Sequence, residues 1–122
     1  MSLAQLMARA EKVVASTQSK LPTEVRFLAE KLPVSYHDWP DEALLGDEFE
    51  DDILGLFVGN HHGLESGSDN SVPPQVFLFL ENIFDEAEGE LSRFDEEVRL
   101  TYLHELGHYL GWDEDDVEAR GL

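Results

Sequence analysis

Two histidines and a glutamate stand close together in the last fifth of the sequence, at a spacing that suits metal chemistry. Residues 104–108 read HELGH. Because an α-helix turns once every 3.6 residues, His104 and His108 lie one above the other on one face, where two imidazoles can bind one metal ion. Glu105 is offset by about 100° around the helix axis, from where its carboxylate can reach a metal-bound water. The pattern predicts a zinc (Zn2+) site with His104 and His108 as ligands and Glu105 as the general base.

A third ligand is expected among the acidic residues that follow. Gly111 tolerates the left-handed conformation in which many helices end, so the chain is predicted to stop its helix there and turn back. Glu114 lies ten residues after His104 and is the first candidate, with Asp113 as the alternative. Glu118 or a water molecule would complete the site if neither of them does. The other interpretation of this segment is a solvated acidic turn without a metal role.

One helix must carry all of these side chains. The segment SRFDEEVRLTYLHELGHYL predicts a helix over about residues 92–110. Ser92 and Asp95 resemble a capping box, which predicts that Ser92 caps the helix. Gly107, between the histidines, either lets a neighbouring strand come close or only packs tightly. An apolar stripe is predicted to face the core, away from the histidines; its members are Leu100, Leu103, Leu106 and Leu110.

The rest of the chain predicts an α+β domain. Apolar periodicity and turn residues predict helices over about 3–18 and 23–32 and strands over 33–38, 53–58 and 76–80. Residue Thr23 is the predicted cap of the second helix. Residues 59–74 are predicted to be a loop and 81–90 an acidic, partly helical connector. No repeat or linker is visible, so residues 1–122 are expected to form a single domain.

The amino-acid composition indicates which cellular compartment and which binding partners to expect. The 122 residues include no cysteine, which excludes disulfides and thiolate zinc sites and fits a reducing compartment. No apolar run reaches the length of a membrane span or a leader, so a cytoplasmic protein without membrane partners is expected. The net charge of −19 opposes nucleic-acid binding and favours metal cations and basic peptides. Solubility is the simpler explanation of this acidity.

Three segments taken together resemble a known family. They are GLFVG, then PPQVFLFLENI, then EEVRLTYLHELGHYLGWDEDD. In this order they resemble the small zincin-like metallopeptidases of bacteria, over about residues 20–122. The resemblance implies a minimal zincin-like domain, with a three- or four-stranded sheet, helices on one face and the HExxH helix near the C-terminus. It also implies zinc ligation by His104 and His108 with Glu105 as general base. Glu114 stands where Asp or His is common in the family motif.

The leading functional hypothesis is a zinc-dependent metallopeptidase. It would hydrolyse peptide bonds through a zinc-bound water activated by Glu105, acting on a basic or flexible peptide or protein. An extended substrate would add to an edge of the sheet, at Val76–Leu80 or at Ile53–Val58.

Two alternatives remain open. No methionine follows the motif, and eight residues follow Glu114, so the C-terminal half of a typical protease cleft is missing. A partner or a second copy of the chain would then complete the cleft, or the protein is a zinc-binding interaction module without catalysis. The third hypothesis, a metal-dependent endoribonuclease, rests on a related histidine spacing and is opposed by the acidic charge.

Other chemically capable side chains are expected to be structural. His61 and His62 fall in the predicted loop, where they are expected to be exposed. His37 falls on a predicted strand and is expected to be partly buried. Arg99 is expected to form a salt bridge.

Overall fold

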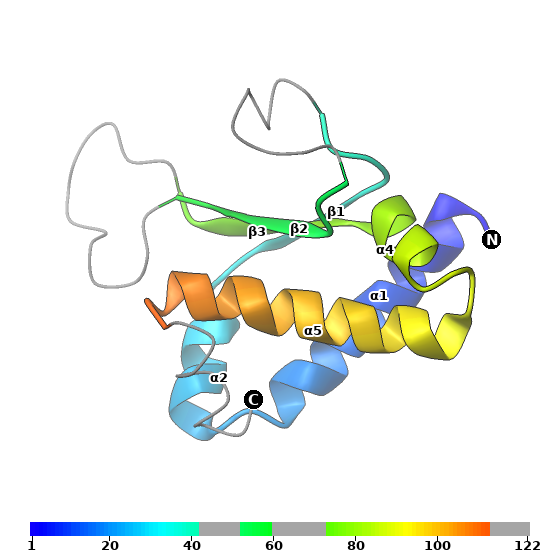
Figure 1. The fold of residues 1–122 in the computed structure, drawn as a ribbon. Coiled ribbons are helices and arrows are strands. Elements are labelled where there is room, and N and C mark those ends of the chain that lie inside the picture. Colours follow the sequence, from blue (N-terminus) through cyan, green and yellow to red (C-terminus); the bar gives the residue numbers. More distant parts are fainter. Residues whose placement is uncertain (42–51, 60–72, 113–122) are drawn as a thin grey trace.

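A computed structural model describes residues 1–41, 52–59 and 73–112 of the chain. Its elements in chain order are α1 (Leu3–Ser19), α2 (Thr23–Ala29), β1 (Val34–His37), β2 (Gly55–Val58), β3 (Gln75–Phe79), α4 (Leu80–Glu86) and α5 (Leu91–Tyr109). The sheet lies across α5, and α1 and α2 lie on the same side of the sheet as α5 (Figure 1). This confirms the predicted α+β class, with helices on one face of a small sheet. No helix in the described ranges is long and apolar enough to cross a membrane.

The sheet has three strands in the order β1-β3-β2. β1 pairs with β3 in parallel, and β2 pairs with β3 in the antiparallel sense. Val76 and Leu78 are fully buried in the main core with the helices, whereas Phe79 belongs to a second apolar cluster with Leu56. Because β3 buries side chains on both of its faces, its sequence is a continuous apolar run rather than an alternating one.

The helix α1 forms where it is predicted, from Leu3 to Ser19. Ser2 caps it through a capping box, because its hydroxyl accepts from the Gln5 N–H and the Gln5 side chain accepts from the Ser2 N–H. Residues spaced three or four apart turn one side of α1 into the core; they are Leu6, Ala10, Val14 and Thr17. This side packs against α5.

The prediction that Ser92 caps α5 is wrong. The helix begins at Leu91 with Glu90 as N-cap, and no side chain caps it. The Ser92 hydroxyl donates to the Glu90 carboxylate instead. Asp95 faces α1, where it receives two hydrogen bonds from Arg9 at 2.7 and 2.8 Å. Asp95 therefore forms an ion pair with Arg9 of α1 instead of the capping-box bond that the sequence predicted.

The predicted end of α5 is confirmed. Gly111 has φ 74°, in the left-handed region. The Gly111 N–H donates to the His108 carbonyl at 3.1 Å, and the Trp112 N–H donates to the Gly107 carbonyl at 2.8 Å. These two bonds are those of a Schellman motif, which satisfies the last carbonyls of the helix and reverses the chain.

One smaller prediction needs correction. The second helix is shorter than expected, ending at Ala29, and Thr23 is its first residue rather than its cap, since Pro22 holds the cap position without a side-chain bond. The acidic connector is partly helical, as predicted, and its helix α4 starts at Leu80 directly after β3.

Candidate metal centre

The helix α5 presents two different sides. Its core side is buried, and the members of that side include Phe94, Val98, Tyr102, Leu103 and Leu106. The Tyr102 hydroxyl accepts a hydrogen bond from Gln18 of α1 at 3.0 Å, and burial raises the pKa of Tyr102. His104 and His108 are exposed on the other side. The candidate ligands therefore stand on an element that is fixed from behind by packing and by polar contacts to α1.

The structure brings His104, Glu105 and His108 together. The two Nε2 atoms lie 3.0 Å apart, and the imidazole rings stand nearly perpendicular, at 88°. Glu105 Oε2 lies 4.0 Å from His104 Nε2. One potential ligand atom from each of the three residues falls within 4.8 Å of the others. All three thus face one point in space.

This donor set fits zinc. Two imidazole nitrogens at zinc–nitrogen distances of about 2.05 Å in a tetrahedral site lie about 3.3 Å apart. The observed separation of 3.0 Å is shorter by a few tenths of an ångström, so a small change of side-chain torsion would admit the ion. Two neutral imidazoles with a nearby carboxylate are also the side chains that zinc binds in hydrolytic sites. The sequence prediction of these three residues as one cluster therefore agrees with the geometry.

Glu105 is buried although it carries a carboxylate, with 7% of its surface exposed. Burial raises the pKa of Glu105, because a charged carboxylate loses hydration there. The nearby histidines and a hydrogen bond from the Phe57 backbone N–H lower it in part. A carboxyl with a raised pKa is better matched to proton transfer near neutral pH than an exposed glutamate.

The close approach of a strand to α5 occurs at Gly55 of β2, which sequence reasoning missed. A Cβ atom at Gly55 would lie 2.6 Å from Thr101 Cγ2 and 3.4 Å from Glu105 Cγ. The contact with Thr101 is too short for a real side chain, whereas that with Glu105 is an ordinary van der Waals distance. The missing Cβ therefore lets β2 lie against the helix beside Glu105. The only signal in the sequence was a glycine inside an apolar strand, which often marks a close backbone approach.

An open cleft of about 340 Å³ adjoins Glu105. The described residues that line it come from α5, from the start of β2 and from the two positions before that strand; they are Ile53, Leu54, Gly55, Leu100, Thr101, His104 and Glu105. Leu100 is 46% exposed, so its predicted place in the core stripe is wrong. The reason is helical geometry: Leu100 lies four residues before His104 and therefore on the same side of the helix.

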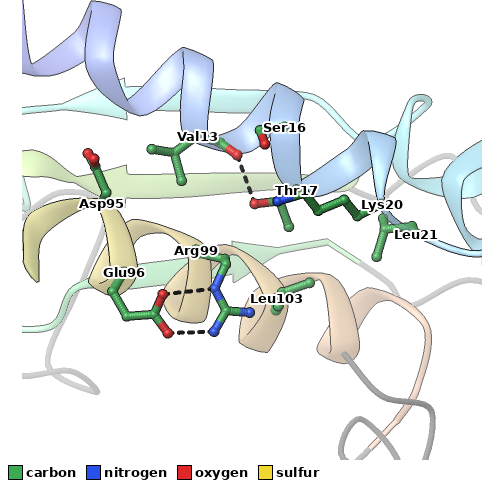
Figure 2. Close-up of a pocket in the computed structure, with 9 residues that line it drawn as sticks. All are labelled: Val13, Ser16, Thr17, Lys20, Leu21, Asp95, Glu96, Arg99 and Leu103. Atoms are coloured by element: carbon green, nitrogen blue, oxygen red, sulfur yellow. Dashed lines mark hydrogen bonds and ion pairs between the residues drawn. The ribbon is translucent and has the colours of Figure 1, made fainter. Parts of the chain in front are cut away.

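A second cavity, of about 320 Å³, lies between α1 and α5 (Figure 2), and neither His104 nor His108 is among the described residues that line it. Among the described residues that line it, the carboxylates are Asp95 and Glu96, and arginines engage both of them. The pair of Arg99 with Glu96 confirms the salt bridge predicted for Arg99. This cavity therefore offers no unpaired carboxylate for hydrolytic chemistry.

The remaining candidates are separate from the cluster. His37 is exposed rather than partly buried, with its ring 5.2 Å from that of Phe77. It lies at the end of the edge strand β1, where no described element covers its side chain. The candidates for the third ligand, Glu114, Asp113 and Glu118, lie outside the described residues, as do His61 and His62.

Comparison with known proteins supplies the family. Residues 29–122 match the zincin-like metallopeptidases, a range that includes the sheet, the cleft and all of α5. The helix α1 precedes the matched range. A search of curated proteins gave no match. Since the match covers more than half of its residues, the chain belongs to the zincin-like metallopeptidase family.

Proposed function

We propose that this protein is a zinc-dependent peptidase in which His104 and His108 bind zinc and Glu105 is the general base. The observation that carries the proposal is the convergence of two exposed imidazole nitrogens and one buried carboxylate on one side of α5, at the rim of a cleft. Exposed ligands beside a cleft leave room for a substrate, unlike the closed coordination of a structural zinc site.

Zinc, when bound, polarises a substrate carbonyl and lowers the pKa of water. Glu105 takes one proton from the attacking water at its carboxylate and passes it to the leaving amine, as the peptide C–N bond breaks. The hydroxyl of the water stays on the carbonyl carbon, so the products are a carboxylic acid and an amine. The Phe57 N–H holds one side of the Glu105 carboxylate in place, which leaves the other oxygen for the proton.

The edge strand β2 is the best receiver for an extended substrate. The alternative, Val76–Leu80, is excluded because β3 is paired on both sides. The Leu54 carbonyl accepts from the Phe79 N–H at 2.9 Å, and the ladder alternates, so the backbone groups of Gly55 and Phe57 point away from β3. Since the Phe57 N–H is engaged by Glu105, the N–H and carbonyl of Gly55 and the carbonyl of Phe57 would receive the peptide.

Glu114 is our proposed third zinc ligand, with Asp113 as the alternative. The Schellman motif at Gly111 supports the proposal, since it reverses the chain at the end of α5 that carries His108. Replacing each carboxylate singly by alanine and measuring zinc affinity would decide between them. The ligand's replacement is expected to weaken zinc binding, whereas the other replacement is expected to leave it unchanged.

Metal content of the untagged protein is the direct test of the site. We expect about one zinc per chain by elemental mass spectrometry, lost in His104→Ala. Chelator-sensitive cleavage of a diverse peptide library is expected for the wild type. Glu105→Gln should keep zinc and lose cleavage, and cleavage retained by this variant would refute the mechanism.

A zinc-binding interaction module is the second candidate function, favoured by the openness of the cleft on its solvent side. It predicts one zinc per chain and no peptide cleavage even when no chelator is present. Chelator-sensitive cleavage that disappears in Glu105→Gln would exclude it.

A further inference from the structure

The cleft beside Glu105 has an apolar wall made from two elements. Leu100 stands on α5 with nearly half of its surface exposed, and Ile53 and Leu54, the two residues before β2, line the same cleft. An exposed leucine forgoes the stabilisation that burial in the core would give it. In this structure it lies next to the candidate catalytic carboxylate instead.

The strand side of this wall is held in place by hydrogen bonds. Asn82, a buried side chain of α4, donates from Nδ2 to the Ile53 carbonyl at 2.9 Å. The Leu54 carbonyl accepts from the Phe79 N–H at the same distance. Because both carbonyls are fixed, the positions of the two apolar side chains relative to α5 are set before any ligand arrives.

The register of a substrate on β2 would direct one side chain into this cleft. Directly opposed residues in an antiparallel pair point their side chains to the same face of the sheet. The direction of a Cβ at Gly55 is toward Thr101 and Glu105, so a substrate residue paired with Gly55 points toward α5.

The charges of the cleft indicate what kind of side chain it takes. Of the described residues that line it, His104 and Glu105 are the ones that can carry charge, and both belong to the candidate metal centre. A lysine or aspartate of a substrate would lose hydration there without gaining a counter-charge, whereas an aliphatic side chain would lose only contact with water. This holds although the whole chain carries a net charge of −19.

We propose that Ile53, Leu54 and Leu100 form a subsite for an aliphatic substrate side chain next to the cleaved bond, and that Leu100 determines this specificity. The proposal rests on the proposed peptidase function for the identity of the ligand. It predicts that the wild-type cleft prefers an aliphatic substrate side chain and that the Leu100→Asp variant prefers lysine.

A binding experiment tests the subsite without turnover. Methyl-labelled Glu105→Gln protein with added zinc would be titrated, by NMR, with N-acetyl-glycyl-leucinamide and with N-acetyl-glycyl-lysinamide. We expect the leucine peptide to shift the methyl signals of Ile53, Leu54 and Leu100, and the lysine peptide to leave them in place. With Leu100→Asp added, the lysine peptide should become the tighter ligand. Equal shifts by both peptides, or shifts remote from these methyl groups, would overturn the subsite.

Phe27→Asp is the matched control. Phe27 lies on α2, is 58% exposed, does not line the cleft, and its replacement changes the net charge by the same amount. The control should keep the preference of the wild type, so that a switch seen only with Leu100→Asp is due to position rather than to charge. A switch of the same size in Phe27→Asp would count against the subsite.

Cleavage profiles separate this proposal from the proposed function. We expect an aliphatic residue at one position beside the cut in a peptide library, and a loss in kcat/KM of about tenfold or more for aliphatic peptides with Leu100→Asp. Chelator-sensitive cleavage without that preference overturns the subsite and leaves the peptidase standing. Absence of cleavage together with selective leucine-peptide shifts overturns the peptidase and supports the subsite as a binding cleft.

Discussion

Gly55 and Thr101 lie so close that a Cβ on the glycine would come within 2.6 Å of the threonine methyl carbon. The strand β2 can therefore touch α5 next to Thr101 only because residue 55 has no side chain. Glu105 stands within the same contact, since its Cγ would lie 3.4 Å from that Cβ and its carboxylate accepts from the Phe57 N–H. The position of the candidate base is thus coupled to the size of one residue on the neighbouring strand.

Gly55→Ala is expected to destabilise the fold by about 1–3 kcal/mol, because the added methyl group must displace Thr101 or the Phe77 carbonyl, 3.2 Å away. Urea unfolding at 25 °C would measure the loss. Thr101→Ser removes the methyl group that the new Cβ meets, so the double variant should recover part of the stability and the single Thr101→Ser variant should lose little. Additive effects of the two changes would contradict the contact.

The ion pair between Arg9 and Asp95 is expected to fasten α1 to the back of the helix that carries the candidate site. It is bidentate, and each side chain is 35% exposed. A double-mutant cycle to alanine should give a coupling energy of about 1 kcal/mol. The more exposed pair of Arg26 and Glu30 within α2 is the control, with an expected coupling of about 0.3–0.5 kcal/mol. Equal couplings would mean that the inter-helix pair has no special role.

Gly111→Ala is expected to destabilise the protein by about 1 kcal/mol, because alanine is strained at a φ of 74°. Asparagine tolerates this conformation better, so Gly111→Asn should lose less. Thermal unfolding of the three proteins would rank them. If alanine and asparagine destabilise equally, the left-handed backbone is not what residue 111 supplies.

Tyr36 is expected to make the fold sensitive to alkali. Burial, with the nearby Glu11 carboxylate, raises its pKa from 10.0 to about 12. The folded state then holds this proton more tightly than the unfolded chain, so the contribution is fully present below pH 10 and is lost as pH rises toward 12. Stability measured by urea unfolding should therefore fall less steeply over pH 9–12 in Tyr36→Phe than in the wild type. Parallel pH profiles would contradict the shift.

The sequence was most informative where local rules and function coincide. HELGH on a periodic helix predicted the cluster of His104, Glu105 and His108, and Gly111 predicted the helix end, because both depend on neighbours within a few residues. The five-residue apolar run Val76–Leu80 predicted a buried strand for the same reason, and β3 covers its first four residues.

The structural features that the sequence did not predict depend mostly on contacts between residues far apart in the chain. Asp95 lies at the right distance from Ser92 for a capping box, but Arg9, 86 residues earlier in the chain, engages it instead. Leu100 is an exception: it fits an apolar stripe, but its place four residues before His104, and so on the side of the cleft, follows from helical spacing alone. The place of β3 in the middle of the sheet follows from pairing between segments that are far apart in sequence, which periodicity does not encode.

No described strand pairs with the outer edge of β2, and this edge bears on the self-association of the protein. An unpaired strand edge that can receive a peptide can also receive the edge of another copy of the same chain, which is how many β proteins aggregate. Each copy carries 27 acidic against 8 basic residues, so two copies repel one another at low salt. The acidity of the chain thus protects the edge from like molecules while it leaves the edge accessible to neutral or basic peptides.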